Sequence, residues 1–130
     1  MSELVRLRLE QARETLDDAR ALLAAGRTPR SVVNRAYYAM FYAVLALLQG
    51  IGKAPSKHAG VVSLFDSEFV HAGAFPKEMS RALHDAFDER HESDYDTVRT
   101  PTRDEAAGLI ASAEQFVRQV TEYVNRSRTD

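Results

Sequence analysis

Arg90 and Asp94 have the residue types and the spacing of a phosphate-binding pair. Four residues apart on a predicted helix, they lie on one face. The planar guanidinium group suits a phosphate, and the carboxylate would hold it in orientation. The same pattern also fits a partly buried ion pair that anchors the helix, because a buried charge is tolerated mainly when it is paired. Tyr95, the next residue, adds a hydroxyl group or a stacking ring.

Arg35 and His58 are two further candidates for the same site. Arg35 precedes a tyrosine-rich segment, where it is either a phosphate ligand, a solvated first-turn residue or the partner of a core carboxylate. His58 is expected in the first turn of a helix, on its apolar face. Most such histidines are simply packed and hydrogen-bonded; the functional alternative is an imidazole that titrates near neutral pH beside a helix N-terminus, where anions are favoured. The predicted ligand site therefore comprises Arg35, His58, Arg90, Asp94 and Tyr95, with His58 and Arg90 as the catalytic candidates.

No metal ion or cofactor is predicted from the sequence. His84, Asp88 and His91 share a helix face, but an acidic helix surface gives that pattern by composition alone. The chain has no cysteine, which removes disulfides, thiol nucleophiles and cysteine-ligated zinc. The nucleotide-binding patterns GxxxxGK[ST] and GxGxxG are absent.

The bulk composition bounds the class of protein. A chain of 130 residues is expected to form a single domain over residues 1–130. Its net charge of −2 provides no general basic field, so an RNA contact would depend on a local patch. The first residues contain no apolar signal region, and we expect a cytoplasmic protein that does not enter a membrane.

Residues 34–48 are the most apolar stretch and predict the element around which the chain is built. The stretch is too long for a buried strand and contains no glycine or proline, so it predicts a helix. Its apolar residues lie all round the helix, which is typical of a buried element. It falls short of the length of a membrane span and carries three tyrosines, so we interpret it as the central helix of a bundle.

Terminal signals divide the rest of the chain into further helices, and no alternating strand pattern is present. The sequence therefore predicts an all-α fold, an antiparallel bundle of about five helices with short connections. A polar tail from about residue 125 is expected to fray. The predicted signals are N-caps at Ser2, Thr28 and Ser56, a C-terminal glycine at Gly26, and a capping box from Thr102 to Glu105.

Three segments in order along the chain resemble small, single-domain HEPN proteins (higher eukaryotes and prokaryotes nucleotide-binding). Residues 34–41 (NRAYYAMF) are similar to the R-A-Y-Y-A-M-F signature of the second helix in that family, and residues 56–60 (SKHAG) to the segment that follows it. Residues 90–96 (RHESDYD) resemble the Arg-x-x-x-Asp-Tyr ending of the fourth helix. The match covers nearly the whole chain.

The resemblance implies a four-helix-bundle-like domain that forms homodimers with a composite site. It also implies a minimal nucleotidyltransferase partner in a toxin–antitoxin-like pair. Several such proteins are metal-independent endoribonucleases with an Arg-x(4–6)-His motif, but neither Arg90 nor Arg81 has a histidine at that spacing. We therefore expect a nucleotide- or RNA-associated binding component. The alternatives are a ribonuclease toxin with a non-standard catalytic set and a structural interaction module without a ligand.

Overall fold

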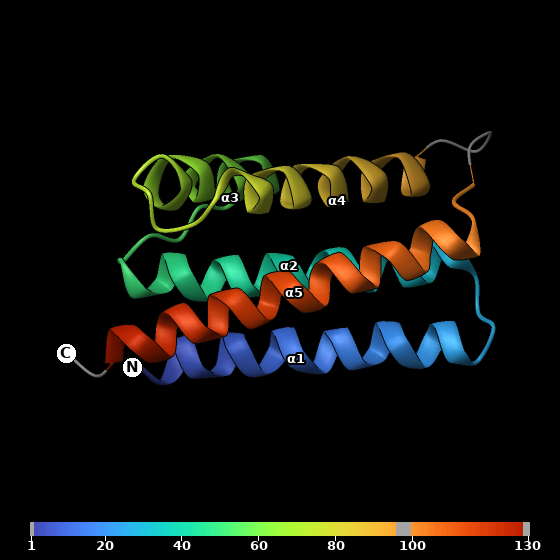
Figure 1. Cartoon of the computed structure of the whole chain (residues 1–130), viewed down its shortest axis with the longest axis horizontal. Coiled ribbons are helices and arrows are strands. Elements are labelled where there is room, and N and C mark those ends of the chain that lie inside the picture. The colour runs from blue at the N-terminus through green and yellow to red at the C-terminus, as the bar shows by residue number, and fades with distance from the viewer. Residues whose placement is uncertain (1, 96–99, 129–130) are drawn as a thin grey trace.

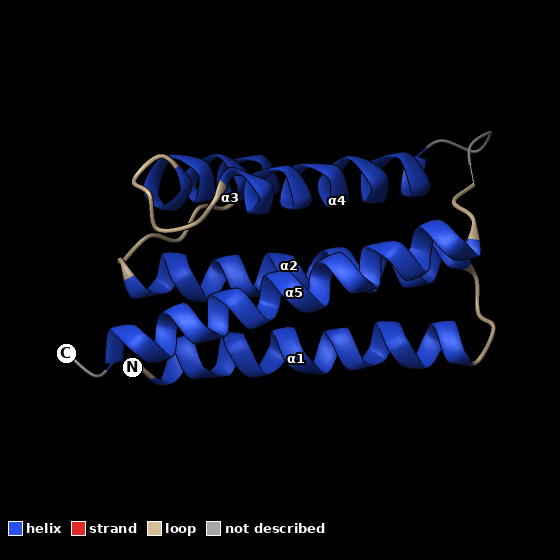
Figure 2. Cartoon of the chain, viewed as in Figure 1, coloured by secondary structure: helices blue, strands red, loops and turns tan. Residues whose placement is uncertain are grey.

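Five α-helices and one π-helical turn form the computed structural model, which describes residues 2–95 and 100–128, without the side chains of residues 95 and 128. α2 and α5 lie between α1 on one side and the paired α3 and α4 on the other (Figure 1). Figure 2 shows helices joined by loops, with no strand in the described part of the chain. The elements are α1 (Glu3–Ala24), α2 (Pro29–Gly50), α3 (His58–Phe65), η1 (Asp66–Val70), α4 (Lys77–Tyr95) and α5 (Arg103–Arg128).

Local signals start and stop most of these helices as the sequence predicts. The Ser2 hydroxyl accepts a hydrogen bond from the Val5 amide, and Thr28 caps α2 through the Ser31 amide. Gly26, just beyond α1, has a φ of 69°, a conformation that glycine adopts without steric cost. These contacts satisfy backbone groups that the helix ends would otherwise leave unpaired.

The expected N-cap at Ser56 is wrong. α3 begins at His58 after Lys57, whose side chain makes no capping hydrogen bond. The helix gains its stability from packing instead, since Val61, Val62 and Phe65 are buried in the core. The sequence prediction was off by one residue. It selected Ser56 because a serine side chain can cap a helix, whereas the N-cap position is occupied by Lys57.

α2 is the central helix, as predicted. It contacts α1, α3, α4 and α5, and its buried residues come from all sides of the helix. By length and hydropathy alone α2 could cross a membrane, but 61% of its most apolar window is buried inside the protein. A core helix of a helical bundle has the same composition.

The α3–η1 segment and α4 form an antiparallel hairpin over α2 (Figure 1). Asp66, the first residue of η1, connects the two sides: its carboxylate accepts a hydrogen bond from Ser80 at 2.6 Å and lies 2.6 Å from His84 Nε2. Under the hairpin, Phe65 packs against Phe69, Phe75 and Phe116. These contacts set the position of α4 relative to α3.

The predicted all-α bundle is therefore confirmed, while the single-domain extent stays a prediction. α5 continues to Arg128, so helical backbone extends beyond the point at which the sequence predicts a polar tail.

The capping box at the start of α5 predicts a measurable contribution to stability. The Thr102 hydroxyl accepts from the Glu105 amide at 3.0 Å, and the Thr102 amide donates to Glu105 Oε1 at 2.9 Å. Thr102→Ala should lower the free energy of unfolding by about 1 kcal/mol in urea denaturation. Thr102→Ser should be close to wild type. A Thr102→Ala protein as stable as wild type would contradict this role.

Thr121→Ala is the matched control for that experiment. Its hydroxyl donates only to the Val117 carbonyl in the same helix, among the described residues. We expect a change within about 0.5 kcal/mol.

Candidate functional site

Two adjacent tyrosines of α2 form the base of the candidate site. Tyr37 is fully buried, and Tyr38 beside it is half-buried. The Tyr37 hydroxyl lies 2.9 Å from His58 Nδ1, which satisfies a polar group that would otherwise be buried without a partner. The first residue of α3 is thereby fixed to the first half of α2.

His58 is held on an aromatic surface. Its ring stacks on Phe41 with centroids 4.3 Å apart and meets the edge of Tyr38 at 5.6 Å. Burial, and secondly the positive charge of Arg90, lower the pKa of His58 below its ordinary value. The imidazole is therefore neutral at neutral pH. Proton acceptance at Nε2 would require the Nδ1–H tautomer, which donates to the Tyr37 oxygen.

Arg90 of α4 contacts the same two tyrosines. Its guanidinium carbon lies 5.5 Å from the Tyr38 ring centroid and 5.8 Å from that of Tyr37, and Nη2 donates to the Tyr38 hydroxyl at 3.3 Å. Arg90 Nε lies 2.9 Å from Asp94 Oδ2, close enough for an ion pair. The predicted pairing of Arg90 with Asp94 is therefore present, one turn apart on α4.

Two buried polar atoms at this end of α4 lack a hydrogen bond. They are Arg90 Nε, whose contact with Asp94 lacks hydrogen-bond geometry, and Ser93 Oγ. No other buried side-chain nitrogen or oxygen in the described part of the chain is left in this state. Buried polar atoms without a partner are rare in folded proteins and require an explanation, such as an ordered water or a ligand.

Arg35 completes the group around Tyr38. Its guanidinium carbon lies 5.2 Å from the Tyr38 ring centroid, and Nη2 donates to Asn34 Oδ1 at 2.9 Å. Arg35 and Asp94 also line one open hollow of about 430 Å³ at the start of α2. The other residues that line this hollow are Leu22, Arg30, Ser31 and Asn34.

The fold thus brings together four of the five residues predicted for the site: Arg35, His58, Arg90 and Asp94. The side chain of Tyr95 lies outside the described residues. Tyr37 and Tyr38 connect these polar groups, although the sequence predicted them only as part of the central helix and of its family signature. The sequence prediction also left out Arg30, which lines the same hollow as Arg35 and Asp94. Its position about one helical turn before Arg35 could have indicated this.

The three residues weighed as metal ligands do not form a metal site. His84 is engaged by Asp66, and no group of three histidine, cysteine, aspartate or glutamate side chains in the described ranges could hold a metal ion. That the protein needs no metal stays a prediction.

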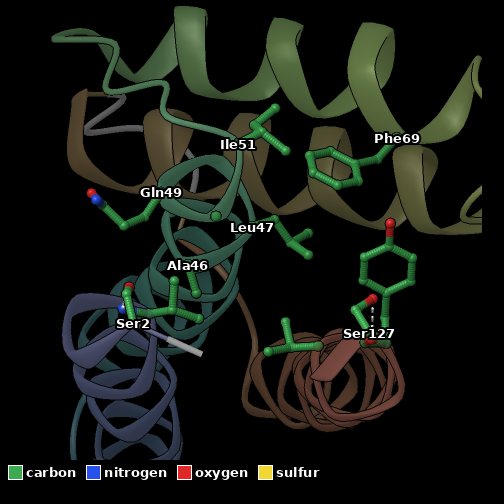
Figure 3. A pocket seen from close by; sticks show the side chains of 11 residues that line it. Ser2, Ala46, Leu47, Gln49, Ile51, Phe69 and Ser127 are labelled. Carbon is green, nitrogen blue, oxygen red and sulfur yellow. Dashed lines mark hydrogen bonds between the residues drawn. The ribbon is translucent and has the colours of Figure 1, made fainter. Parts of the chain in front are cut away.

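A different hollow, of about 400 Å³, lies at the opposite end of α2 (Figure 3). Leu47, Ile51 and Phe69 contribute apolar surface to it, with Gln49 and Ser127 at its edge. No charged side chain of the described chain lines it. It therefore lacks the chemistry to bind a phosphate, and the groups around Tyr38 remain the candidate site.

The lowered pKa of His58 predicts a pH-dependent stability. Below its ordinary value of 6.5 the unfolded chain takes up a proton at this position before the folded protein does. The His58 contribution to stability is thus complete above that pH and decreases as the pH falls. His58→Gln should flatten the pH dependence of the free energy of unfolding, measured by urea denaturation between about pH 5 and pH 8.

His71→Gln, at an exposed histidine, is the control for this measurement. It should leave the slope between acid and neutral pH close to wild type. Equal slopes for the His58 variant and the wild type would show that His58 is not the group responsible.

Known proteins resemble this chain in sequence and in fold. A "UPF0332 protein" of Thermotoga maritima is 41% identical over 107 residues, which cover 82% of this chain and 80% of the relative. A protein of Methanocaldococcus jannaschii named "Putative toxin MJ0605" is 36% identical over 118 residues, with coverage of 91% and 87%. The crystal structure of TT1696 from Thermus thermophilus matches with a TM-score of 0.79 over 94% of this chain and 99% of that chain.

The likeness to the solved structure, at 21% identity, shows the fold alone. The sequence relatives are more similar, and they align over most of their own length. The family model of the HEPN domain matches residues 5–123, which is nearly the whole chain. The chain therefore belongs to the HEPN domain family.

Proposed function

We propose that this protein is the HEPN component of a toxin–antitoxin-like pair and that it binds the phosphate groups of a nucleotide or an RNA. Arg90 and Arg35 are the phosphate ligands, Asp94 orients Arg90, and His58 is the neighbouring hydrogen-bond donor or base. Tyr95 is a further ligand in this proposal. The site acts in a dimer that works with a nucleotidyltransferase-like partner protein.

The unsatisfied donor of Arg90 is the observation that carries this proposal. Arg90 Nε is buried without a hydrogen bond. Among the described residues, the Arg90 side chain makes one hydrogen bond, from Nη2 to the Tyr38 hydroxyl. A guanidinium group has five N–H donors, arranged in a fork that matches a phosphate. A purely structural arginine would be expected to use more of its donors on protein acceptors.

The toxin–antitoxin-like role is supported by the names of relatives, such as "Putative toxin MJ0605" of Methanocaldococcus jannaschii. For the dimer, the support is the resemblance to HEPN proteins, which commonly form dimers. A nucleotidyltransferase partner follows from the family resemblance. The homodimer and its complex with a nucleotidyltransferase are both part of the proposal.

Binding is favoured over cleavage by the number of acid–base groups. Metal-independent RNA cleavage through the 2′-hydroxyl needs a base, an acid and a group that stabilises the phosphate. Within the described part of the site, His58 is the single imidazole that contacts the two tyrosines. The phenol of Tyr37 is a weak acid, because burial raises its pKa well above the ordinary value.

A ribonuclease is the second candidate, favoured by the state of His58. A neutral imidazole beside an arginine has the right protonation state for a general base. The second acid–base group would then have to come from the other subunit of the dimer. In the third candidate, a structural interaction module, the same residues only hold α4 against α2.

Substitution of the two arginines tests the binding site. Arg90→Gln and Arg35→Gln should each weaken binding of a fluorescent single-stranded RNA by about tenfold, measured by anisotropy, because each removes a charged phosphate ligand. Arg118→Gln, at an exposed arginine of α5, is the control with the same charge change. Because Arg90→Gln also leaves Asp94 unpaired, its melting temperature is measured alongside.

The outcomes of this experiment separate the candidates. Loss of affinity in the Arg35 and Arg90 variants alone supports the proposed site. Wild-type protein that binds neither RNA nor nucleotides, together with unfolding of the Arg90 variant, supports the structural module instead.

Cleavage is tested by incubating the protein with labelled RNA in the presence of a chelator. Under the binding proposal the RNA stays intact, and induced expression leaves cellular RNA unchanged. Chelator-resistant cleavage that His58→Gln reduces by about 10²-fold or more would establish the ribonuclease and displace the binding proposal.

A further inference from the structure

A second group of basic side chains lies outside the candidate site, between η1 and the start of α4. His71, Lys77 and Arg81 line an open hollow of about 630 Å³, together with Val70 and Ser80. All three basic residues are exposed. Among the described residues, no carboxylate lines this hollow. The hollow therefore concentrates positive charge in a protein whose net charge is −2.

Two carboxylates of η1 are engaged by other groups, and the exposed Glu78 and Asp85, three residues before and four after Arg81 on α4, form no ion pair with it. Asp66 accepts from Ser80 and lies against His84, and Glu68 pairs with Lys53 at 3.1 Å. Within residues 2–95 and 100–128, neither Lys77 nor Arg81 forms an ion pair. Two flexible cations without a carboxylate partner are available to an external anion.

In the hollow between α1 and α5, by contrast, acidic residues lie beside the basic ones. Arg13 and Arg118 line it, but so do Asp17, Glu114 and Glu122. Arg20 there pairs with both Asp17 and Glu114. Arg20 is thus paired directly with acidic residues on that side of the bundle, whereas Lys77 and Arg81 beside η1 form no ion pair with any carboxylate of the described residues.

The position of the cationic hollow relates it to the candidate site. Lys77 and Arg90 are thirteen residues apart on α4, which corresponds to about 20 Å along the helix axis. The α3–η1 segment runs beside α4 (Figure 1). His58 is its first residue, and His71 directly follows its last. The hairpin therefore carries the Arg90–His58 group at one end and the cationic hollow at the other.

We propose that this hollow is a second phosphate subsite, where Lys77 and Arg81, assisted by His71, hold the phosphodiester backbone of an RNA strand. The inference rests on the proposed function, because the same strand is held at its other end by Arg35 and Arg90. An open hollow with exposed, flexible cations fits a polymer that passes over the surface. The subsite adds affinity for long strands and none for a dinucleotide.

The test compares RNA length and salt dependence. The double variant Lys77→Gln/Arg81→Gln should weaken binding of a single-stranded RNA of about ten nucleotides by roughly tenfold and reduce the slope of log affinity against log salt by about 1.4. Binding of a dinucleotide should be unchanged. The double variant Arg13→Gln/Arg118→Gln has the same charge change and should leave both RNAs close to wild type, as measured by fluorescence anisotropy.

Each outcome assigns success or failure to one of the two sites. If the Lys77/Arg81 and Arg13/Arg118 variants behave alike while Arg90→Gln still weakens binding, the subsite is wrong and the proposed function stands. If long RNA depends on Lys77 and Arg81 but not on Arg90, RNA binding at the hollow is upheld, while the proposed Arg90 site and the shared strand between the two sites are wrong. If wild-type protein binds neither RNA, both proposals are overturned.

Discussion

The burial of the Tyr37 phenol is the constraint on which the site depends. Tyr37 has no exposed surface, yet its hydroxyl must find a hydrogen-bond partner inside the protein. It finds His58 Nδ1 at 2.9 Å. That hydrogen bond fixes the start of α3 against α2, and through it the buried Tyr37 holds the imidazole of His58 in position. Tyr38, next along the helix, then faces the side on which Arg35 and Arg90 lie.

The same arrangement explains the electrostatics of the site. Arg90 is held by the faces of two aromatic rings and by Asp94, contacts that stabilise a partly desolvated cation. Its charge in turn contributes to lowering the pKa of His58, which stays neutral and keeps a lone pair at neutral pH. A stable core and a chemically prepared site therefore depend on the same interactions, so substitutions here affect both folding and binding.

The α3–α4 hairpin contains both a carboxylate engaged by two partners and basic side chains that form no ion pair with another described residue. Near the middle, Asp66 is satisfied by Ser80 and His84, which fixes η1 to α4. Beyond it the cationic side chains beside η1 have no carboxylate partner in the described part of the chain. A π-helical turn at this point is consistent with a functional role, since such turns are frequent at functional sites. A protein with a small negative net charge can thus present a local surface suited to a polyanion.

Sequence alone determined the helices, the central place of α2 and the family. Their signals are local: apolar periodicity, the caps at Ser2 and Thr28, and the capping box at Thr102. It failed at Ser56, where packing of α3 and not a side-chain cap sets the helix start. It also proposed Arg35, His58, Arg90, Asp94 and Tyr95 as one site, but local spacing could pair only Arg90 with Asp94. Only the tertiary structure decided that the first four meet around Tyr37 and Tyr38, because contacts between residues 35, 58 and 90 depend on how three helices pack, and no local pattern encodes that.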